Sequence, residues 1–311
     1  MTVLLGTASC GEEQSDPETP AAPDNSGGLE PAMTVDPGPP PVVDLLDAGE
    51  GEQRVLAYAP SREPTMVAVT SSGTARTAVP DAQPRVDDTP EQTLTVAGES
   101  EPGVDGAQRA VVTVEEFTSV DEHRAAQFAT APGFTITWVR GADGVVSQLS
   151  LEAPSDATDA ARAGVEITAG AISDATVVFP SEPIGVGARW AVTRDLRDAV
   201  APRRVSTYEL TGLDADVAPV RMETSAPDVS DTLTAPAQDG GPGITLDVDT
   251  YEVTGSGELT VDLRAPLPVG GTTESSTRAV YVDPGTGRRT TYDEDSVLRF
   301  RSVSGDTAPA E

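Results

Sequence analysis

The chain has 311 residues, of which 51 are acidic and 20 are basic, so its formal net charge is −31. A field of that sign repels nucleic acid, and no cluster of basic residues offsets it locally, so the charge excludes a nucleic-acid partner. Every basic residue is an arginine, and the absence of lysine excludes a Walker A loop, a pyridoxal Schiff base and the catalytic lysine of a kinase.

Large apolar side chains are scarce in this chain. It has five Phe, five Tyr and two Trp against 29 Gly and 27 Pro, and most of its other apolar residues are Ala and Val. Because small side chains bury little surface each, the composition predicts an extensive sheet or a partly open core. No run of about 18 apolar residues occurs, so the sequence predicts no transmembrane helix.

The first notable segment is residues 3–9, a short apolar run that ends in small residues before Cys10, the one cysteine of the chain. This segment resembles the end of a bacterial lipoprotein signal peptide, in which such a cysteine is cleaved and acylated. Thr7 stands where these signals usually carry Leu, and no basic residue precedes Arg54. The resemblance implies a residual signal segment over 1–10, a lipid anchor on Cys10, and a membrane-bound protein on the outer face of the cytoplasmic membrane, in the cell envelope. The alternative is a cysteine without a role near a frayed terminus.

Residues 11–52 carry eight prolines and eleven acidic residues but no basic residue. Such a segment cannot bury enough apolar surface to offset the entropy lost on ordering. The composition therefore predicts a disordered, extended acidic linker over 11–52, followed by a folded domain over 53–303 and a disordered tail over 304–311.

Short runs rich in β-branched and aromatic residues recur through residues 53–303, which predicts a β-rich domain. The clearest runs are residues 67–69, 94–96, 111–114 and 134–138. Turn residues between apolar runs predict three hairpins: residues 134–140 with 145–151, residues 245–254 with 258–263, and residues 278–282 with 288–292.

One helix is predicted over residues 155–175, with Ser155 or Asp156 as the N-cap. Its apolar face contains Ala161, Gly164 or Val165, Thr168 and Ile172, which lie on one side at helical spacing. A narrow, alanine-rich face suits close packing on a sheet. The predicted fold is therefore α+β, mostly β: a long curved antiparallel sheet, half-barrel-like, packed on one central helix.

Residues 179–190, FPSEPIGVGARW, lead from this helix back into a strand. The step resembles uncharacterised actinobacterial-type lipoproteins, domains of unknown function. The whole pattern is more distantly similar to lipoprotein-carrier and mycobacterial glycolipid-binding half-barrel lipoproteins. The hypothesis that follows is a lipid-anchored protein with a groove for a lipid or other hydrophobic ligand between sheet and helix, lined by Ile136, Trp138, Val165, Ile172, Phe179 and Trp190. The alternative is that these residues form the core of a structural or interaction domain without a ligand.

Catalytic and metal-binding patterns are weak. His123 is the single histidine, it is surrounded by charged residues, and we expect it in a solvated loop. Without a second histidine or a cysteine partner, the chain offers no zinc or facial-triad set. Asp-rich stretches such as 247–249 lack the order of an EF-hand loop. The sequence therefore predicts a monomeric protein that is not an enzyme and uses no cofactor or metal.

Overall fold

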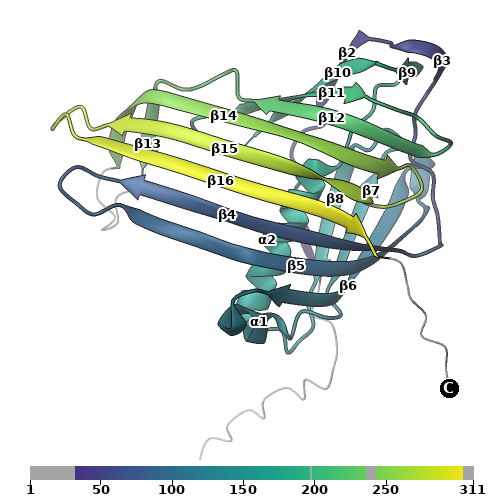
Figure 1. Cartoon of the computed structure of the whole chain (residues 1–311), viewed down its shortest axis with the longest axis horizontal. Coiled ribbons are helices and arrows are strands. Elements are labelled where there is room, and N and C mark those ends of the chain that lie inside the picture. Colours follow the sequence, from purple (N-terminus) through teal and green to yellow (C-terminus); the bar gives the residue numbers. More distant parts are fainter. Residues whose placement is uncertain (1–31, 197, 236–242, 304–311) are drawn as a thin grey trace, which may run out of the picture.

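The computed structural model describes residues 32–196, 198–235 and 243–303, and one antiparallel sheet of 14 strands makes up most of that part of the chain (Figure 1). The predicted signal segment with Cys10, residues 11–31 of the predicted linker and the predicted tail 304–311 lie outside the described residues. The strands are β1 (Met33–Val35), β2 (Val42–Asp47), β3 (Glu50–Arg54), β4 (Thr65–Ala78), β5 (Arg85–Pro102), β6 (Gln108–Ser119), β7 (Thr135–Arg140), β8 (Val146–Glu152), β9 (Ile184–Val186), β10 (Arg189–Asp195), β11 (Arg203–Leu210), β12 (Val217–Ser225), β13 (Thr232–Ala235), β14 (Ile244–Asp262), β15 (Gly270–Val282) and β16 (Arg289–Ser302). The helices are α1 (Glu122–Phe128), α2 (Asp159–Ala175) and a 3-10 turn, η1 (Val104–Gly106).

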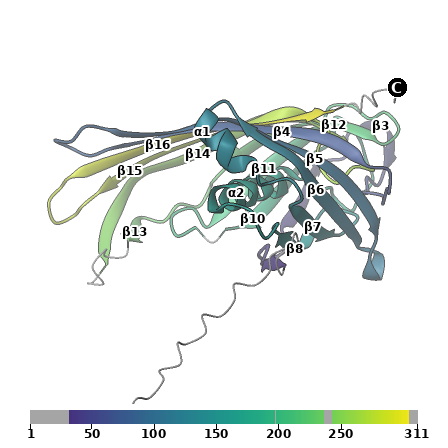
Figure 2. The ribbon, with the colours of Figure 1, turned by 90° about the horizontal axis from the view of Figure 1, so that it is seen from below.

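The order of strands in the large sheet is β1-β8-β7-β6-β5-β4-β16-β15-β14-β12-β11-β10-β2, with β13 also paired to β14, while β3 and β9 form a separate pair. The two edge strands, β1 and β2, are consecutive in the chain and are joined by residues 36–41. That segment reaches roughly 25 Å at most, so the two edges of the sheet must lie near each other. The sheet therefore curls round, and Figure 2 shows α2 inside the curve. The predicted fold class, a mostly β protein with a long curved antiparallel sheet on a central helix, is confirmed.

The predicted boundary between linker and domain is wrong. Strands β1 to β3 lie inside residues 33–54, where the composition predicted disorder up to residue 52. Val43 pairs with Val192 and Thr34 pairs with Ser150, so this segment supplies both edges of the large sheet. Its backbone gains ladder hydrogen bonds from a sheet that composition alone cannot reveal. Residues 33–54 thus belong to the folded domain.

Helix α2 starts at Asp159 and not at residue 155. Thr158 is the N-cap, because its hydroxyl accepts a hydrogen bond from the backbone N–H of Ala161 at 3.1 Å. The predicted buried face is confirmed, and it consists of Ala161, Gly164, Val165, Thr168, Ala169, Ile172 and Ala175.

A second helix, α1, occupies the region predicted as a loop around His123. Asp121 caps it by accepting a hydrogen bond from the backbone N–H of Arg124 at 2.9 Å. His123 is exposed on this helix, and its ring lies 3.1 Å from the side-chain amide of Gln127. Seven residues are too few for a helical period to stand out in the sequence, so the helix was missed.

Two of the three predicted hairpins are confirmed. Strands β7 and β8 pair through a turn in which Gly144 has φ +95°, and β15 and β16 pair through a turn closed by the carboxylate of Asp283. The hairpin predicted around Gly255 and Gly257 is wrong, because β14 continues through both. A side chain at Gly257 would lie 2.7 Å from the carbonyl oxygen of Thr272 on the neighbouring strand. These glycines therefore permit close strand packing and do not make a turn.

The core holds a chain of four buried aromatic rings that joins β10 and β11 to the segment after α2. Ring centroids lie 5.6 Å apart for Tyr58 and Phe179, 5.8 Å for Phe179 and Trp190, and 5.4 Å for Trp190 and Tyr208. The indole N–H of Trp190 donates to the carbonyl of Val178 at 2.8 Å, which satisfies its polar end. These contacts fix the segment that follows α2.

The long strands β4, β5, β14, β15 and β16 extend beyond α2 (Figure 1). We call their outer parts the wing, which comprises residues 74–78, 85–91, 244–254, 276–282 and 289–295. Strand β6 pairs with β5 only from Gln92 onward, so residues 85–91 form an edge of the wing. Asp87, Asp88 and Pro90 lie on that edge, and charges and proline discourage pairing with another chain.

Candidate functional site

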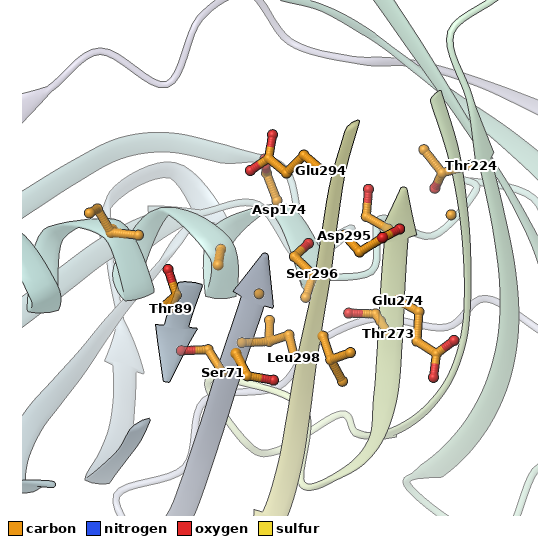
Figure 3. A pocket seen from close by; sticks show the side chains of 18 of the residues that line it. Ser71, Thr89, Asp174, Thr224, Thr273, Glu274, Glu294, Asp295, Ser296 and Leu298 are labelled. Carbon is orange, nitrogen blue, oxygen red and sulfur yellow. The ribbon is translucent and has the colours of Figure 1, made fainter. Parts of the chain in front are cut away.

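A cavity of about 480 Å³ lies between α2 and the concave face of the sheet (Figure 3). One wall is α2, which contributes Ile167, Ala171, Asp174 and Ala175. The opposite wall is the sheet, and the main residues on it are Ser71, Gly73, Ala75, Asp87, Thr89, Gln92, Arg204, Ser206, Met222, Thr224, Val253, Gly255, Thr273, Ser275, Glu294, Ser296 and Leu298. The cavity is large enough for a small organic ligand.

The cavity exists because one row of small residues crosses six neighbouring strands. Cross-strand pairing joins its members in sequence, and the row, which we call the small row, consists of Gly73, Ser296, Ser275, Gly255, Thr224 and Ser206. All six line the cavity. Helix α2 presents Ala171 and Ala175 to the same space, so small side chains face each other across it and leave it open.

The polarity of the cavity changes along its length. Figure 3 shows Leu298, Ser296 and Glu294 in succession along β16. Leu298 is 8% exposed and belongs to the core, whereas Ser296 and Glu294 are exposed. Met222 lies beside the inner end and is 9% exposed. The inner end is therefore apolar, the middle carries hydroxyl groups and the outer end carries a carboxylate.

Two ion pairs border the cavity. Arg204 contacts Asp174 at the carboxyl-terminal end of α2 at 2.8 Å, and Arg85 contacts Asp87 on β5 at 2.8 Å. Glu294 has no such cationic partner among the described residues, and its carboxylate accepts a hydrogen bond from the hydroxyl of Tyr292 at 2.6 Å. Glu294 is therefore the carboxylate of the outer end that no arginine neutralises.

Three tyrosines lie just beyond the outer end, on the concave face of the wing. Ala279, which is fully buried, pairs with Tyr251 on one side and with Tyr292 on the other, and Tyr281 follows two positions along the same strand. Burial raises the pKa of Tyr251 to about 12, and the negative charge of Asp198 adds to this shift. Burial and the hydrogen bond to Glu294 raise the pKa of Tyr292. The tyrosines thus remain neutral hydroxyl donors.

The six residues predicted to line a groove all belong to the filled core. Ile136, Trp138, Val165, Ile172, Phe179 and Trp190 are each at most 3% exposed and form part of one buried cluster. None of them lines the cavity. Their position matches the alternative interpretation, in which they are core residues, and the cavity lies on another side of α2.

Sequence reasoning missed the residues that do line the cavity. Gly73 and Gly255 were the available signal, because glycine inside a strand marks close backbone approach or a ligand. A side chain at Gly73 would lie 2.9 Å from the carbonyl oxygen of Asp295. Their alignment in one row depends on strand register, which the sequence does not state.

A second depression of about 520 Å³ lies over β12, β14 and β15. It is bordered by Arg221, which contacts Glu258 at 3.3 Å and Glu209 at 3.7 Å. All the residues that line it belong to the sheet and its adjoining turns, with none from α2, so the cavity beside α2, which has two facing walls, is the better candidate for a ligand.

The described residues contain neither a metal-binding cluster nor a membrane-spanning helix. No group of three or more His, Cys, Asp or Glu side chains there is arranged to hold a metal ion. Within the same residues, no helix has the length and apolar character needed to cross a membrane.

Comparisons with known proteins do not assign this chain to a family. No protein-family model matches the chain, and none of the curated proteins matches it. A solved structure described as "Lipid-protein interactions in lipovitellin" is similar over 82% of this chain and 26% of that chain, with 11% sequence identity and a TM-score of 0.41. A likeness this weak does not define a function, and the resemblance to lipoprotein families stays a prediction.

Proposed function

We propose that this protein is a binding module without catalytic activity, which holds a hydrophobic or amphipathic ligand in the cavity between α2 and the sheet. The observation that carries the proposal is the small row. Six aligned small residues keep about 480 Å³ free beside an otherwise filled core. A domain with a purely structural role gains stability by filling such a void, since lost packing costs free energy.

The lining supports an amphipathic ligand. Leu298 and Met222 offer apolar contacts at the inner end, and Ile167 on α2 is 71% exposed beside the cavity. Exposed large apolar side chains next to a cavity gain from contact with an apolar ligand. Ser71 and Ser296 supply hydroxyl groups that orient a polar part of the ligand.

The test is binding of diphenylhexatriene, a neutral apolar dye whose fluorescence rises outside water. Ala171→Trp places a large side chain in the cavity from α2, and Ala163→Trp places the same side chain on the exposed side of the same helix. We expect Ala171→Trp to weaken dye binding at least about tenfold, a change of about 1.4 kcal/mol, and Ala163→Trp to leave it unchanged.

The results distinguish the two functional hypotheses. Saturable binding to the wild-type chain, lost only in Ala171→Trp, supports a ligand site. Absence of saturable binding, or equal binding by both variants, would contradict it and favour a structural or interaction domain with no small-molecule ligand. Native mass spectrometry of protein purified from its own host then identifies the ligand that is bound in the cell.

The second part of the proposal concerns location. The run before Cys10 supports acylation of that cysteine and attachment of the protein to the outer face of the cytoplasmic membrane. Stable attachment needs more than one acyl chain, as bacterial lipoproteins have. We expect Cys10→Ala to move the protein from the membrane fraction to the soluble fraction. Unchanged fractionation, or an intact mass without added lipid, would contradict the anchor.

A further inference from the structure

We infer that the ligand carries a positively charged ammonium head, which Glu294 and the tyrosines of the wing hold at the outer end of the cavity. This inference rests on the proposed function, because the apolar body of the same ligand occupies the inner end. The cationic head follows from the charges and rings at the outer end.

Most charged residues that line the cavity and point into it are paired with one another or with a neighbour. Arg204 is the one cation among them, and it is paired with Asp174 at 2.8 Å. Asp87 is paired with Arg85. Side chains alternate along a strand, so Glu274 and Asp295 point to the opposite face while Glu294 shares the concave face with Ser296. Among the residues that line the cavity, Glu294 is therefore the concave-face carboxylate for which the described residues supply no cationic partner, and Asp198 adds a second negative charge near Tyr251.

The tyrosines add a second feature that suits an ammonium group. Tyr251, Tyr281 and Tyr292 lie on three neighbouring strands around the small, buried Ala279, all on the concave face. Aromatic rings attract cations through the negative face of their π systems, and several tyrosines around one point are typical of sites for quaternary ammonium groups. The hydroxyl of Tyr292 also fixes the carboxylate of Glu294 at 2.6 Å.

The residues of β16 connect the inner end of the cavity to Glu294 and Tyr292, where the ammonium head would lie. Along β16 the concave residues run from Leu298 through Ser296 and Glu294 to Tyr292. Alternate residues on a strand lie about 7 Å apart, so Leu298 and Tyr292 are roughly 20 Å apart along the strand. A ligand with an apolar body in the cavity thus places a charged end beside Glu294 without leaving the concave face.

The experiment compares three dyes that share one fluorescent body and differ in charge: neutral diphenylhexatriene, its trimethylammonium derivative and its propionic acid derivative. We expect the wild-type chain to bind the cationic dye about tenfold more tightly than the neutral dye, and the anionic dye least tightly. Glu294→Gln should abolish most of the preference for the cation while leaving the neutral dye unaffected.

The control addresses the net charge of −31, which attracts any cation. Glu252→Gln removes the same charge from an exposed residue of β14 that does not line the cavity. We expect it to keep the preference. Equal losses in both variants, or no preference in the wild-type chain, would overturn the ammonium head while binding of the neutral dye still upholds the proposed function.

Two further measurements complete the test. Tyr251→Leu removes one ring and should lower the affinity for the cationic dye about threefold without changing that for the neutral dye. Tetramethylammonium, a head without an apolar body, should fail to displace the cationic dye. Displacement at matching concentrations would overturn the assignment of an amphiphile, and failure of every dye to bind would remove the proposed function itself.

Discussion

Two glycines of α2 provide a test of how the helix packs in the sheet. Gly164 lies on the buried face, and a Cβ atom added there would be 2.6 Å from Cε1 of Phe117 and 3.2 Å from Cε1 of Phe128. Those two rings are buried and stacked, with centroids 4.0 Å apart, so neither can move aside easily. Gly170 is exposed, and a Cβ atom there meets nothing within 4 Å.

The same substitution should stabilise the protein at Gly170 but not at Gly164. Glycine to alanine stabilises a helix interior by about 0.8–1.0 kcal/mol through backbone entropy. Gly170→Ala should therefore raise the free energy of unfolding by nearly that amount. Overpacking a core costs about 1–3 kcal/mol, so Gly164→Ala should be neutral to about 2 kcal/mol destabilising. Because the propensity gain is common to both, the difference between the variants measures the overpacking alone.

Urea unfolding followed by circular dichroism gives both values from the midpoints, provided that the slopes stay equal. A difference of about 1–3 kcal/mol, with Gly170→Ala the more stable variant, is the expected result. If both variants gain stability equally, then Gly164 is not in contact with the stacked rings, and the described seating of α2 on the sheet is incorrect.

Two other predictions concern the buried cation and the phenol beside it. Arg140 is 1% exposed, donates to the carbonyls of Ala265 and Pro266 at 3.0 and 2.9 Å, and lies 3.9 Å from the ring centroid of Tyr58. Arg140→Met leaves both carbonyls unpaired and should lower the free energy of unfolding in urea by about 2–4 kcal/mol. An unchanged midpoint would contradict the described role of the guanidinium. Burial raises the pKa of Tyr58 from 10.0 to about 12. The neutral phenol therefore contributes its full stability below pH 10, and this contribution falls as the pH rises towards 12, by roughly 3 kcal/mol at most. Tyr58→Phe should be less stable than wild type by about 1 kcal/mol at pH 8, because the hydrogen bond to Val177 is lost. Its alkaline decline should be shallower than that of wild type but not absent, since Tyr251 also has a raised pKa. Parallel pH profiles would refute the assignment.

Local patterns in the sequence determined much of the secondary structure. The face of α2 with Val165 and Ile172, and the turns at Gly144 and Asp283, were predicted correctly because each depends on residues close together in the chain. The pair Gly255 and Gly257 was misinterpreted for the same reason. Glycine suits both a turn and a tight strand crossing, and only the neighbouring strand decides between them.

The other features of the fold and the cavity depend on how strands that are far apart in the chain pair with each other. Strands β1 and β2 are ordered because they pair with β8 and β10, which lie far away in the chain, although the composition of residues 33–47 favours disorder. The small row brings together residues from 73 to 296, and only the register of six strands aligns them. The sequence by itself fixed which segments could form strands and which face of α2 would be buried, since these are properties of local spacing. Only the tertiary structure placed the void and its unpaired carboxylate, because both arise where strands far apart in the chain are aligned.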